Sequence, residues 1–176
     1  MENTIEEKIL QAKPYELDAE EILERIIRLG FGGDRDLYER FRQKFIDNLP
    51  AGTGVSLRGS ALTNERYEDG TPFDSKGKGT SDLDITLIGQ ETLAMFKPEE
   101  FYIPGLHSKP LGDKDPDIAT PELNALRLEL QEMVGRPVNI HVTGDSVLFV
   151  RDVLLGQPHF MIIQPEETAK SDTQNS

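Results

Sequence analysis

Hydrophobic residues recur at helical spacing in two segments near the start of the chain. Asp18 begins a capping-box pattern with Glu21, and apolar residues follow at helical spacing until Gly30. A second set of apolar residues recurs close to every fourth position before Pro50: Leu37, Phe41, Phe45 and Leu49. These spacings predict one amphipathic helix from Asp18 to Gly30 and a second one that Pro50 ends.

Alternating or continuous apolar runs predict short β-strands in four places. The runs are VSLRGS (55–60), DLDITLIG (82–89), VNIHV (138–142) and HFMII (159–163). A Pro-rich irregular segment follows the second run, and it leads to a helix from Thr120, the N-cap, to Gly135. A further helix is predicted from Asp145 or Ser146 to Gly156.

Strands that alternate with helices predict the fold class. We expect a layered α/β (α+β) domain, in which helices pack against a small mixed β-sheet. The polar ends of the chain favour a flexible N-terminus over residues 1–14, one domain over 15–164 and a disordered tail over 165–176. The polar segment 61–81 is predicted to be a surface loop, and loops of this length are uncommon unless they are functional.

The charge of the chain limits its partners. In 176 residues, 19 Lys and Arg stand against 32 Asp and Glu, which gives a net charge of −13. This balance speaks against binding of extended nucleic acid, because that binding depends on basic residues that replace phosphate counterions. A small polyphosphate that carries a divalent metal remains compatible, since the metal supplies positive charge locally.

The absence of cysteine and of long apolar runs bears on the expected chemistry and location of the protein. Without cysteine the chain has no disulfide, thiolate metal site or cysteine nucleophile. The first residues lack the basic and apolar parts of a secretion signal, and no apolar run approaches the roughly 20 residues of a membrane span. We therefore expect a cytoplasmic protein with no membrane partner.

Two aspartates stand out in the second predicted strand. Because side chains alternate along a strand, Asp82 and Asp84 project from one face, while Leu83 and Ile85 point to the other. Carboxylates roughly 7 Å apart on one strand face can converge on a divalent cation, and Mg²⁺ or Mn²⁺ takes oxygen ligands of this kind. The alternative is a solvated strand face of the type that any half-exposed strand shows.

The end of the first predicted strand favours the functional interpretation. In LRGS, Gly59 lets the backbone approach a ligand closely, and the Ser60 hydroxyl with nearby amides can hold phosphate oxygens. A hydrophobic strand that ends in Gly-Ser, followed by a strand with Asp-hydrophobic-Asp-hydrophobic, resembles the signature of the DNA polymerase β-like nucleotidyltransferase superfamily. The resemblance extends from about Val55 to Ile163.

This resemblance implies a nucleotidyltransferase-like fold and a Mg²⁺-dependent reaction. It implies that Gly59 and Ser60 hold the triphosphate of an NTP and that Asp82 and Asp84 bind the metal. The reaction would transfer a nucleoside monophosphate to a hydroxyl acceptor, either a small molecule or a protein. Arg58, Arg66, Lys76 and Lys78 are further candidates to contact the nucleotide, the last three from the loop.

The third predicted strand departs from the family pattern. Where the family has a third carboxylate, this strand presents Asn139 and His141. Asn139 can offer a metal a neutral carbonyl oxygen but cannot accept a proton, and His141 is either a general base or an exposed strand histidine. A substitute carboxylate could come from GDKDPD, which contains Asp113, Asp115 and Asp117. The missing acid leaves an alternative open, namely a catalytically degenerate module that senses nucleotide or binds protein.

Overall fold

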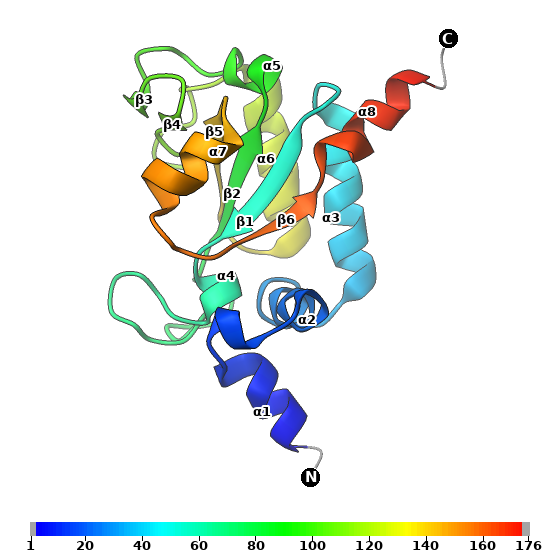
Figure 1. The fold of residues 1–176 in the computed structure, drawn as a ribbon, viewed down its shortest axis with the longest axis vertical. Helices are drawn as coiled ribbons and strands as arrows, with labels where there is room; N and C mark the ends of the chain where they lie inside the picture. The colour runs from blue at the N-terminus through cyan, green and yellow to red at the C-terminus, as the bar shows by residue number, and fades with distance from the viewer. Residues whose placement is uncertain (1–2, 174–176) are drawn as a thin grey trace.

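A four-stranded mixed sheet forms the centre of the molecule (Figure 1). The structure is a computed structural model, and it describes residues 3–173. Its sheet has the order β5-β2-β1-β6, in which β1 is antiparallel to β2 and β6 while β2 is parallel to β5. These strands are β1 (Gly54–Arg58), β2 (Leu83–Ile88), β5 (Val138–Thr143) and β6 (His159–Ile163). A small separate hairpin pairs β3 (Phe101–Ile103) with β4 (His107–Ser108).

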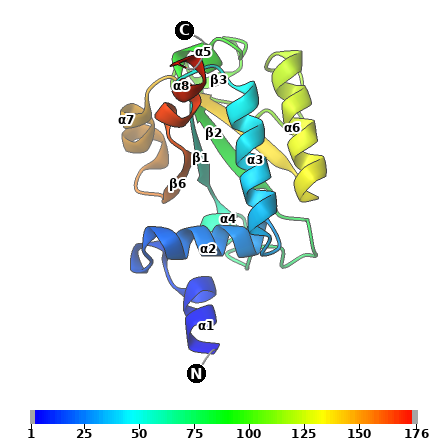
Figure 2. The same cartoon turned by 90° about the vertical axis from the view of Figure 1, so that its right-hand side faces the viewer.

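Helices lie on both faces of the sheet. On one face are α3 and α6, and on the other face is α7 with the π-helical turn η2 that follows it (Figure 2). The helical elements are α1 (Asn3–Gln11), η1 (Pro14–Glu16), α2 (Ala19–Gly30), α3 (Arg35–Asn48), α4 (Ser60–Thr63), α5 (Gln90–Leu93), α6 (Pro121–Val134), α7 (Ser146–Leu148), η2 (Phe149–Leu154) and α8 (Pro165–Thr173). The expected mixed α/β architecture with a small mixed sheet is therefore confirmed.

Local sequence signals explain where the long helices begin. The Asp18 carboxylate accepts a hydrogen bond from the Glu21 amide at 2.9 Å, and the Glu21 carboxylate accepts one from the Asp18 amide at 3.2 Å. The Thr120 hydroxyl caps α6, and Gly135 ends this helix with a φ of 68°, which favours glycine. Both helices therefore start and stop where the sequence predicts.

The core lies between the sheet and the helices α3 and α6. Leu57, Ile85 and Ile140 from three adjacent strands are fully buried, and Phe41 and Leu130 face them from the helices with no exposed surface. Burial of a large apolar side chain of this kind stabilises the fold by about 1.5–3 kcal/mol. The strands also carry polar side chains, and Ser56, Thr86 and His141 among them are buried.

The ends of the chain differ from the sequence prediction, because helices form where flexible segments were expected. The buried Arg25 guanidinium donates to the carbonyls of Ile9 and Ala12, which fixes the end of α1. The Thr168 hydroxyl donates to the Thr53 carbonyl at 3.0 Å and ties α8 to the sheet. These contacts join residues distant in sequence, so composition does not reveal them. The expectation for residues 1–2 and 174–176 lies outside the described residues.

Two other segments contain short elements that their composition did not indicate. The polar segment 61–81 begins within α4, and the Pro-rich segment before α6 contains the β3–β4 hairpin. The helix expected from Asp145 to Gly156 is divided into α7 and η2. Within residues 3–173, no helix is long and apolar enough to cross a membrane.

Candidate functional site

The topology of the sheet brings the Gly-Ser turn and the aspartates to the same place. Because β1 and β2 are antiparallel, the turn that follows β1 lies beside the residue that precedes β2. Gly59 and Ser60 therefore lie next to Asp82 and Asp84, although a long loop separates them in sequence. A Cβ placed on Gly59 would lie 3.6 Å from the Cβ of Asp84.

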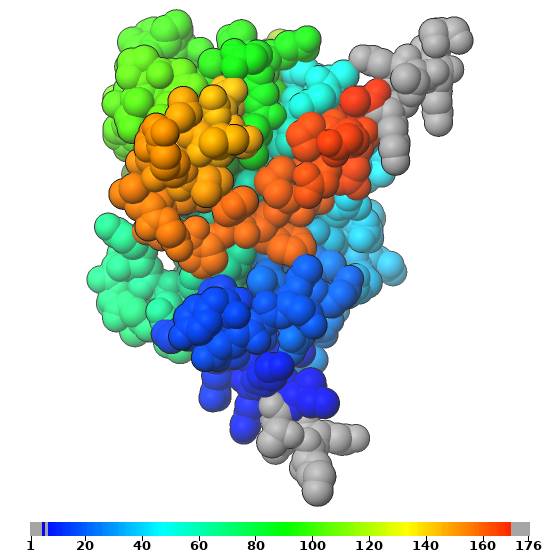
Figure 3. All heavy atoms as spheres, in the orientation of Figure 1, coloured from blue at the N-terminus to red at the C-terminus, as the bar shows by residue number. Residues whose placement is uncertain are grey.

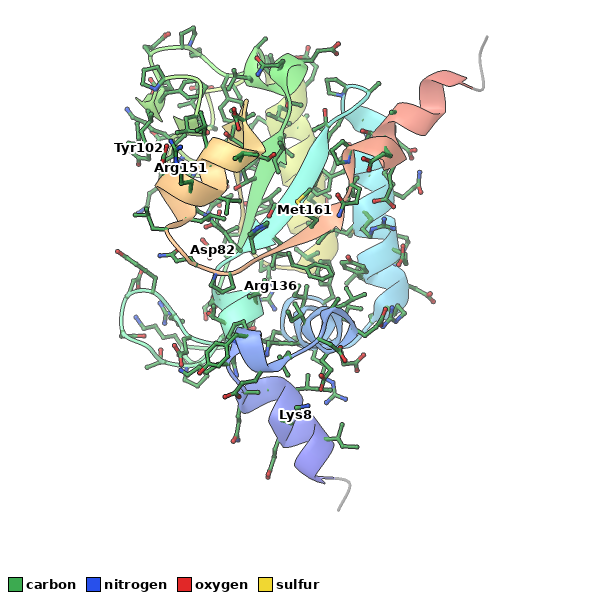
Figure 4. The ribbon with its side chains drawn as sticks, in the orientation of Figure 1. Lys8, Asp82, Tyr102, Arg136, Arg151 and Met161 are labelled. Atoms are coloured by element: carbon green, nitrogen blue, oxygen red, sulfur yellow. The ribbon has the colours of Figure 1, made fainter. Side chains whose placement is uncertain are left out.

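A cleft of about 580 Å³ opens at this end of the sheet. It lies between the loop 61–81 and the segment with α7 and η2, which appear in Figure 3 as the teal lobe and the orange band above it. Figure 4 places Asp82 at the lower end of the sheet, beneath that orange segment. The cleft lining includes the residues on which the functional argument rests: Arg58, Gly59, Ser60, Arg66, Tyr67, Glu68, Asp82, Asp84 and His107.

Gly59 adopts a backbone conformation that favours glycine. Its φ of 90° lies in the region that L side chains rarely adopt. Gly59 is the N-cap of α4, and Ser60 is the first residue of this helix. The turn thus places backbone and the Ser60 hydroxyl at the cleft without an intervening side chain.

Asp84 is the more enclosed of the two carboxylates. Its Oδ2 lies 3.3 Å from Arg58 Nε and its Oδ1 lies 3.4 Å from His141 Nε2. Burial raises the pKa of Asp84 to about 6, against the opposing effect of the Arg58 charge. Among the described residues, buried side-chain atoms without a hydrogen-bond partner include Asp84 Oδ1, Arg58 Nε, Thr86 Oγ1 and His107 Nδ1. Buried polar atoms are normally hydrogen-bonded, so these four atoms call for a partner such as water or an ion.

Asp82 stands at the mouth of the cleft and is held by Asn139. The Asn139 amide donates a hydrogen bond from Nδ2 to Asp82 Oδ2 at 2.6 Å. Although the Asp82 side chain reaches solvent, the surrounding protein desolvates it and raises its pKa, and the neighbouring Asp84 charge raises it further. In this geometry Asn139 is a hydrogen-bond donor to Asp82, whereas the sequence had suggested an oxygen ligand for a metal.

The two histidines of this region form a stacked pair. The rings of His107 and His141 lie 5.5 Å apart at an interplanar angle of 15°. His141 Nδ1 lies 3.0 Å from the Ser108 carbonyl, and only 7% of the residue is exposed, so the alternative of an exposed strand histidine is wrong. Burial lowers the pKa of each histidine to about 4, which keeps both rings neutral near pH 7.

A largely buried ion pair between Arg136 and Asp74 ties the loop 61–81 to the rest of the fold. Arg136 Nη1 and Nη2 donate to the two carboxylate oxygens of Asp74 at 2.8 Å and 3.1 Å. Arg136 Nη1 also donates to the Ser81 carbonyl at 3.0 Å, and the Asp74 carboxylate accepts from the Ser81 amide at 2.9 Å. Figure 4 shows Arg136 at the same end of the sheet as Asp82. The pair therefore fixes the residue next to Asp82.

Several predicted site residues lie elsewhere. Lys76 and Lys78 are exposed and do not line the cleft, whereas Arg66 from the same loop does. Asp113 Oδ1 lies 3.0 Å from Arg127 Nη1 in a separate ion pair. Asp115 and Asp117 are also absent from the cleft lining, so GDKDPD supplies no carboxylate there.

Tyr67, Glu68 and His107 are among the cleft residues that sequence reasoning missed. Tyr67 and Glu68 are adjacent to Arg66 in the loop, but no periodicity distinguishes them. The β3–β4 hairpin brings His107 over the sheet, and this hairpin had no signal in its Pro-rich sequence. Among the described residues, no group of three or more His, Cys, Asp or Glu is arranged to hold a metal ion. Asp82 and Asp84 would therefore need additional ligands from substrate or water.

Comparisons with known proteins do not assign the chain to a family. Neither a protein-family model, nor a curated protein, nor a solved structure matches it. The chemistry of the cleft residues is therefore the ground for a functional assignment.

Proposed function

We propose that this protein is a nucleotidyltransferase with a DNA polymerase β-like fold. It transfers a nucleoside monophosphate from an NTP to a hydroxyl acceptor and depends on Mg²⁺ or Mn²⁺. One observation carries the proposal: the Gly59–Ser60 turn and both aspartates, which are far apart in sequence, line one cleft. A triphosphate needs donors and a cation needs carboxylates, and this cleft offers both within one volume.

The carboxylates fit a divalent cation. Asp84 Oδ1 is a buried acceptor without a donor. Both aspartates have raised pKa values because burial disfavours the charged forms, and the charge of Asp84 raises the pKa of Asp82 further. A bound cation would relieve both costs, and it would supply Lewis-acid polarisation of the phosphate. Asp82 and Asp84 would hold it, while Asn139 keeps Asp82 oriented through its 2.6 Å hydrogen bond.

The remaining cleft residues suit the triphosphate. The Ser60 hydroxyl and nearby amides are donors for phosphate oxygens. Arg66 brings a guanidinium to the loop side of the cleft, where it pairs with Glu68 at 3.0 Å. Arg58 lies against Asp84 and also over the Phe149 ring at 5.7 Å, so its guanidinium is held in place from two sides. Binding and orientation by these groups would place the α-phosphate next to the acceptor hydroxyl.

One observation also favours a second function. Asn139 occupies the strand position where the resemblance requires a third carboxylate, and its amide is already bonded to Asp82. A chain that binds Mg²⁺ and nucleotide but transfers slowly, or does not transfer, would be a nucleotide-sensing module. A missing general base typically costs about 10²–10⁴-fold in rate.

Isothermal titration calorimetry with Mg²⁺ and each NTP tests the shared part of both functions. We expect saturable binding to the wild type and loss of that binding in Asp82→Asn. Asp152→Asn is the matched control, because Asp152 lies on η2 in a surface ion pair with Arg151 and outside the cleft. If the wild type binds no nucleotide, both functions are excluded.

Pyrophosphate release then distinguishes the two functions. The wild type is incubated with Mg²⁺, an NTP and a panel of hydroxyl acceptors, and pyrophosphate is measured with a coupled assay. Release that depends on Asp82 and Asp84 supports the transferase. Nucleotide binding without release across the panel supports the sensing module.

A further inference from the structure

We propose that Tyr67 is the surface on which the base of the bound nucleotide stacks, and this inference rests on the proposed function. The loop 61–81 would then position the nucleoside, while the ends of β1 and β2 hold the metal and the triphosphate. The role is one of substrate positioning, because the ring would contact the base and not the reacting phosphorus.

The exposure of Tyr67 is the first observation. The residue is 96% exposed, although it lines the cleft that contains Asp82 and Asp84. Tyrosine has a large apolar body with a polar tip, and complete exposure leaves its ring faces without contacts. A flat π surface at the edge of a binding cleft can therefore gain contacts only from a ligand or a partner.

The backbone that carries Tyr67 is held by its own hydrogen bonds. The Arg66 amide donates to the Thr71 carbonyl at 2.7 Å, and the Gly70 amide donates to the Arg66 carbonyl at 2.8 Å. The Asp69 carboxylate accepts from the Thr71 amide at 3.0 Å and from its hydroxyl at 2.5 Å. Tyr67 thus sits inside a closed turn, which reduces the ordering cost when a ligand binds.

The base of the loop is fixed as well. The Asn64 side chain accepts from the Phe73 amide at 3.0 Å and donates to the Leu10 carbonyl at 2.8 Å. The Asp74–Arg136 ion pair holds the last part of the loop, which leads into β2, next to Asp82. The position of Tyr67 relative to the aspartates is therefore set by contacts on both sides of the turn.

The chemistry around Tyr67 points to a nucleobase as its partner. Arg66 and Glu68 on either side are charged, and the lining of the cleft includes hydroxyl and carboxylate groups such as Ser60 and Asp82. This surrounding suits a metal-bound triphosphate and not a large apolar ligand. The exposed Tyr67 ring beside it suits the flat, uncharged base of an NTP, and stacking of this kind tolerates every base.

Two ligands separate base contacts from phosphate contacts. Affinities for a Mg²⁺-NTP and for Mg²⁺-tripolyphosphate, which has no base, are measured by calorimetry for Tyr67→Ala, Tyr67→Phe and the wild type. Tyr67→Ala should weaken NTP binding by roughly 5- to 150-fold and leave tripolyphosphate binding within about 2-fold. Tyr67→Phe should bind both ligands like the wild type, because it keeps the ring.

Tyr15→Ala is the matched control. Tyr15 is 85% exposed in η1 and does not line the cleft, so its removal should change neither affinity. The inference is overturned if Tyr67→Ala binds the NTP like the wild type, if it loses both ligands equally, or if Tyr67→Phe also loses the NTP. A wild type that binds neither ligand overturns the proposed function itself, which is a distinct result.

Discussion

At the scale of single residues, Asp84 should make cation binding in the cleft depend on pH. A carboxylate binds a cation only after it loses its proton, and burial has raised the pKa of Asp84 to about 6. Protons therefore compete with Mg²⁺ below this pKa but not at pH 8. We expect Mg²⁺ affinity to be constant from pH 8 to 7 and to fall below pH 6 by up to about tenfold per pH unit.

Calorimetric titration of Mg²⁺ between pH 5 and 8 measures this dependence. Asp84→Asn removes the titrating group, and it should bind Mg²⁺ weakly at every pH. An affinity for the wild type that stays unchanged down to pH 5 would contradict the assignment of Asp84 as a ligand with a raised pKa.

Asn139 offers a second test at the residue scale. Replacement by aspartate would put a carboxylate at the position whose amide now donates to Asp82 at 2.6 Å, and the hydrogen bond would become a like-charge contact. We expect Asn139→Asp to lower the free energy of unfolding by about 1–3 kcal/mol in EDTA. Mg²⁺ should restore more stability to this variant than to the wild type, because a cation would bridge the new acid to Asp82.

Urea denaturation with EDTA and with Mg²⁺ gives the four free energies that this comparison needs. Asn139→Ala serves as the control, because it loses the hydrogen bond without gaining a charge. Equal effects of Mg²⁺ on the aspartate variant and on the wild type would show that Asn139 does not lie beside a cation site.

At the scale of elements, the loop 61–81 depends on Arg136. The Arg136 side chain is only 7% exposed. Its guanidinium donates hydrogen bonds to the Asp74 carboxylate, to the Ser81 carbonyl and to the carbonyls of Leu29 and Gly30 at the end of α2. Arg136→Met would leave the Asp74 carboxylate enclosed without its partner. Loss of one member of a buried ion pair typically costs about 3–5 kcal/mol, and we expect a decrease in the free energy of unfolding near the lower end of this range.

Urea unfolding of Arg136→Met and Arg151→Met compares a buried pair with an exposed one. Arg151 pairs with Asp152 on η2, and both side chains are largely exposed, so its loss should cost less than about 1 kcal/mol. Similar costs for the two variants would show that the Asp74–Arg136 pair does not fix the loop.

The same elements show how far sequence reasoning reaches. The helix limits at Asp18, Thr120 and Gly135 follow from interactions within a few residues, so the sequence predicts them. The shared face of Asp82 and Asp84 follows from the two-residue period of a strand.

The parts that sequence reasoning missed depend on partners distant in the chain. Asp74 and Arg136 are 62 residues apart, and a lone aspartate in a polar loop carries no sign of its partner. His107 reaches His141 only because the β3–β4 hairpin folds over the sheet. Arg25 fixes α1 through backbone carbonyls, and such acceptors have no sequence signature at all. Pattern and spacing therefore identified the Gly59–Ser60 turn and the Asp82–Asp84 pair, but not the contacts that hold them in place.

At the scale of the whole molecule, the order of the sheet decides where chemistry can occur. Helices α3 and α6 cover one face of the sheet, and α7 with η2 lies on the other (Figure 2). The end of β1 and the starts of β2 and β5 lie at the same end of the sheet, which brings Gly59, Asp82 and Asn139 together. The net charge of −13 favours a triphosphate that carries a divalent cation at this end of the sheet.

A crystal structure with Mn²⁺ and a non-hydrolysable NTP analogue tests this account most directly. Mn²⁺ gives an anomalous signal and takes the same oxygen ligands as Mg²⁺. We predict an anomalous peak at the carboxylates of Asp82 and Asp84, with the triphosphate against Gly59 and Ser60. A nucleotide bound elsewhere on the molecule, or no Mn²⁺ peak at these two aspartates, would contradict the proposed nucleotidyltransferase site.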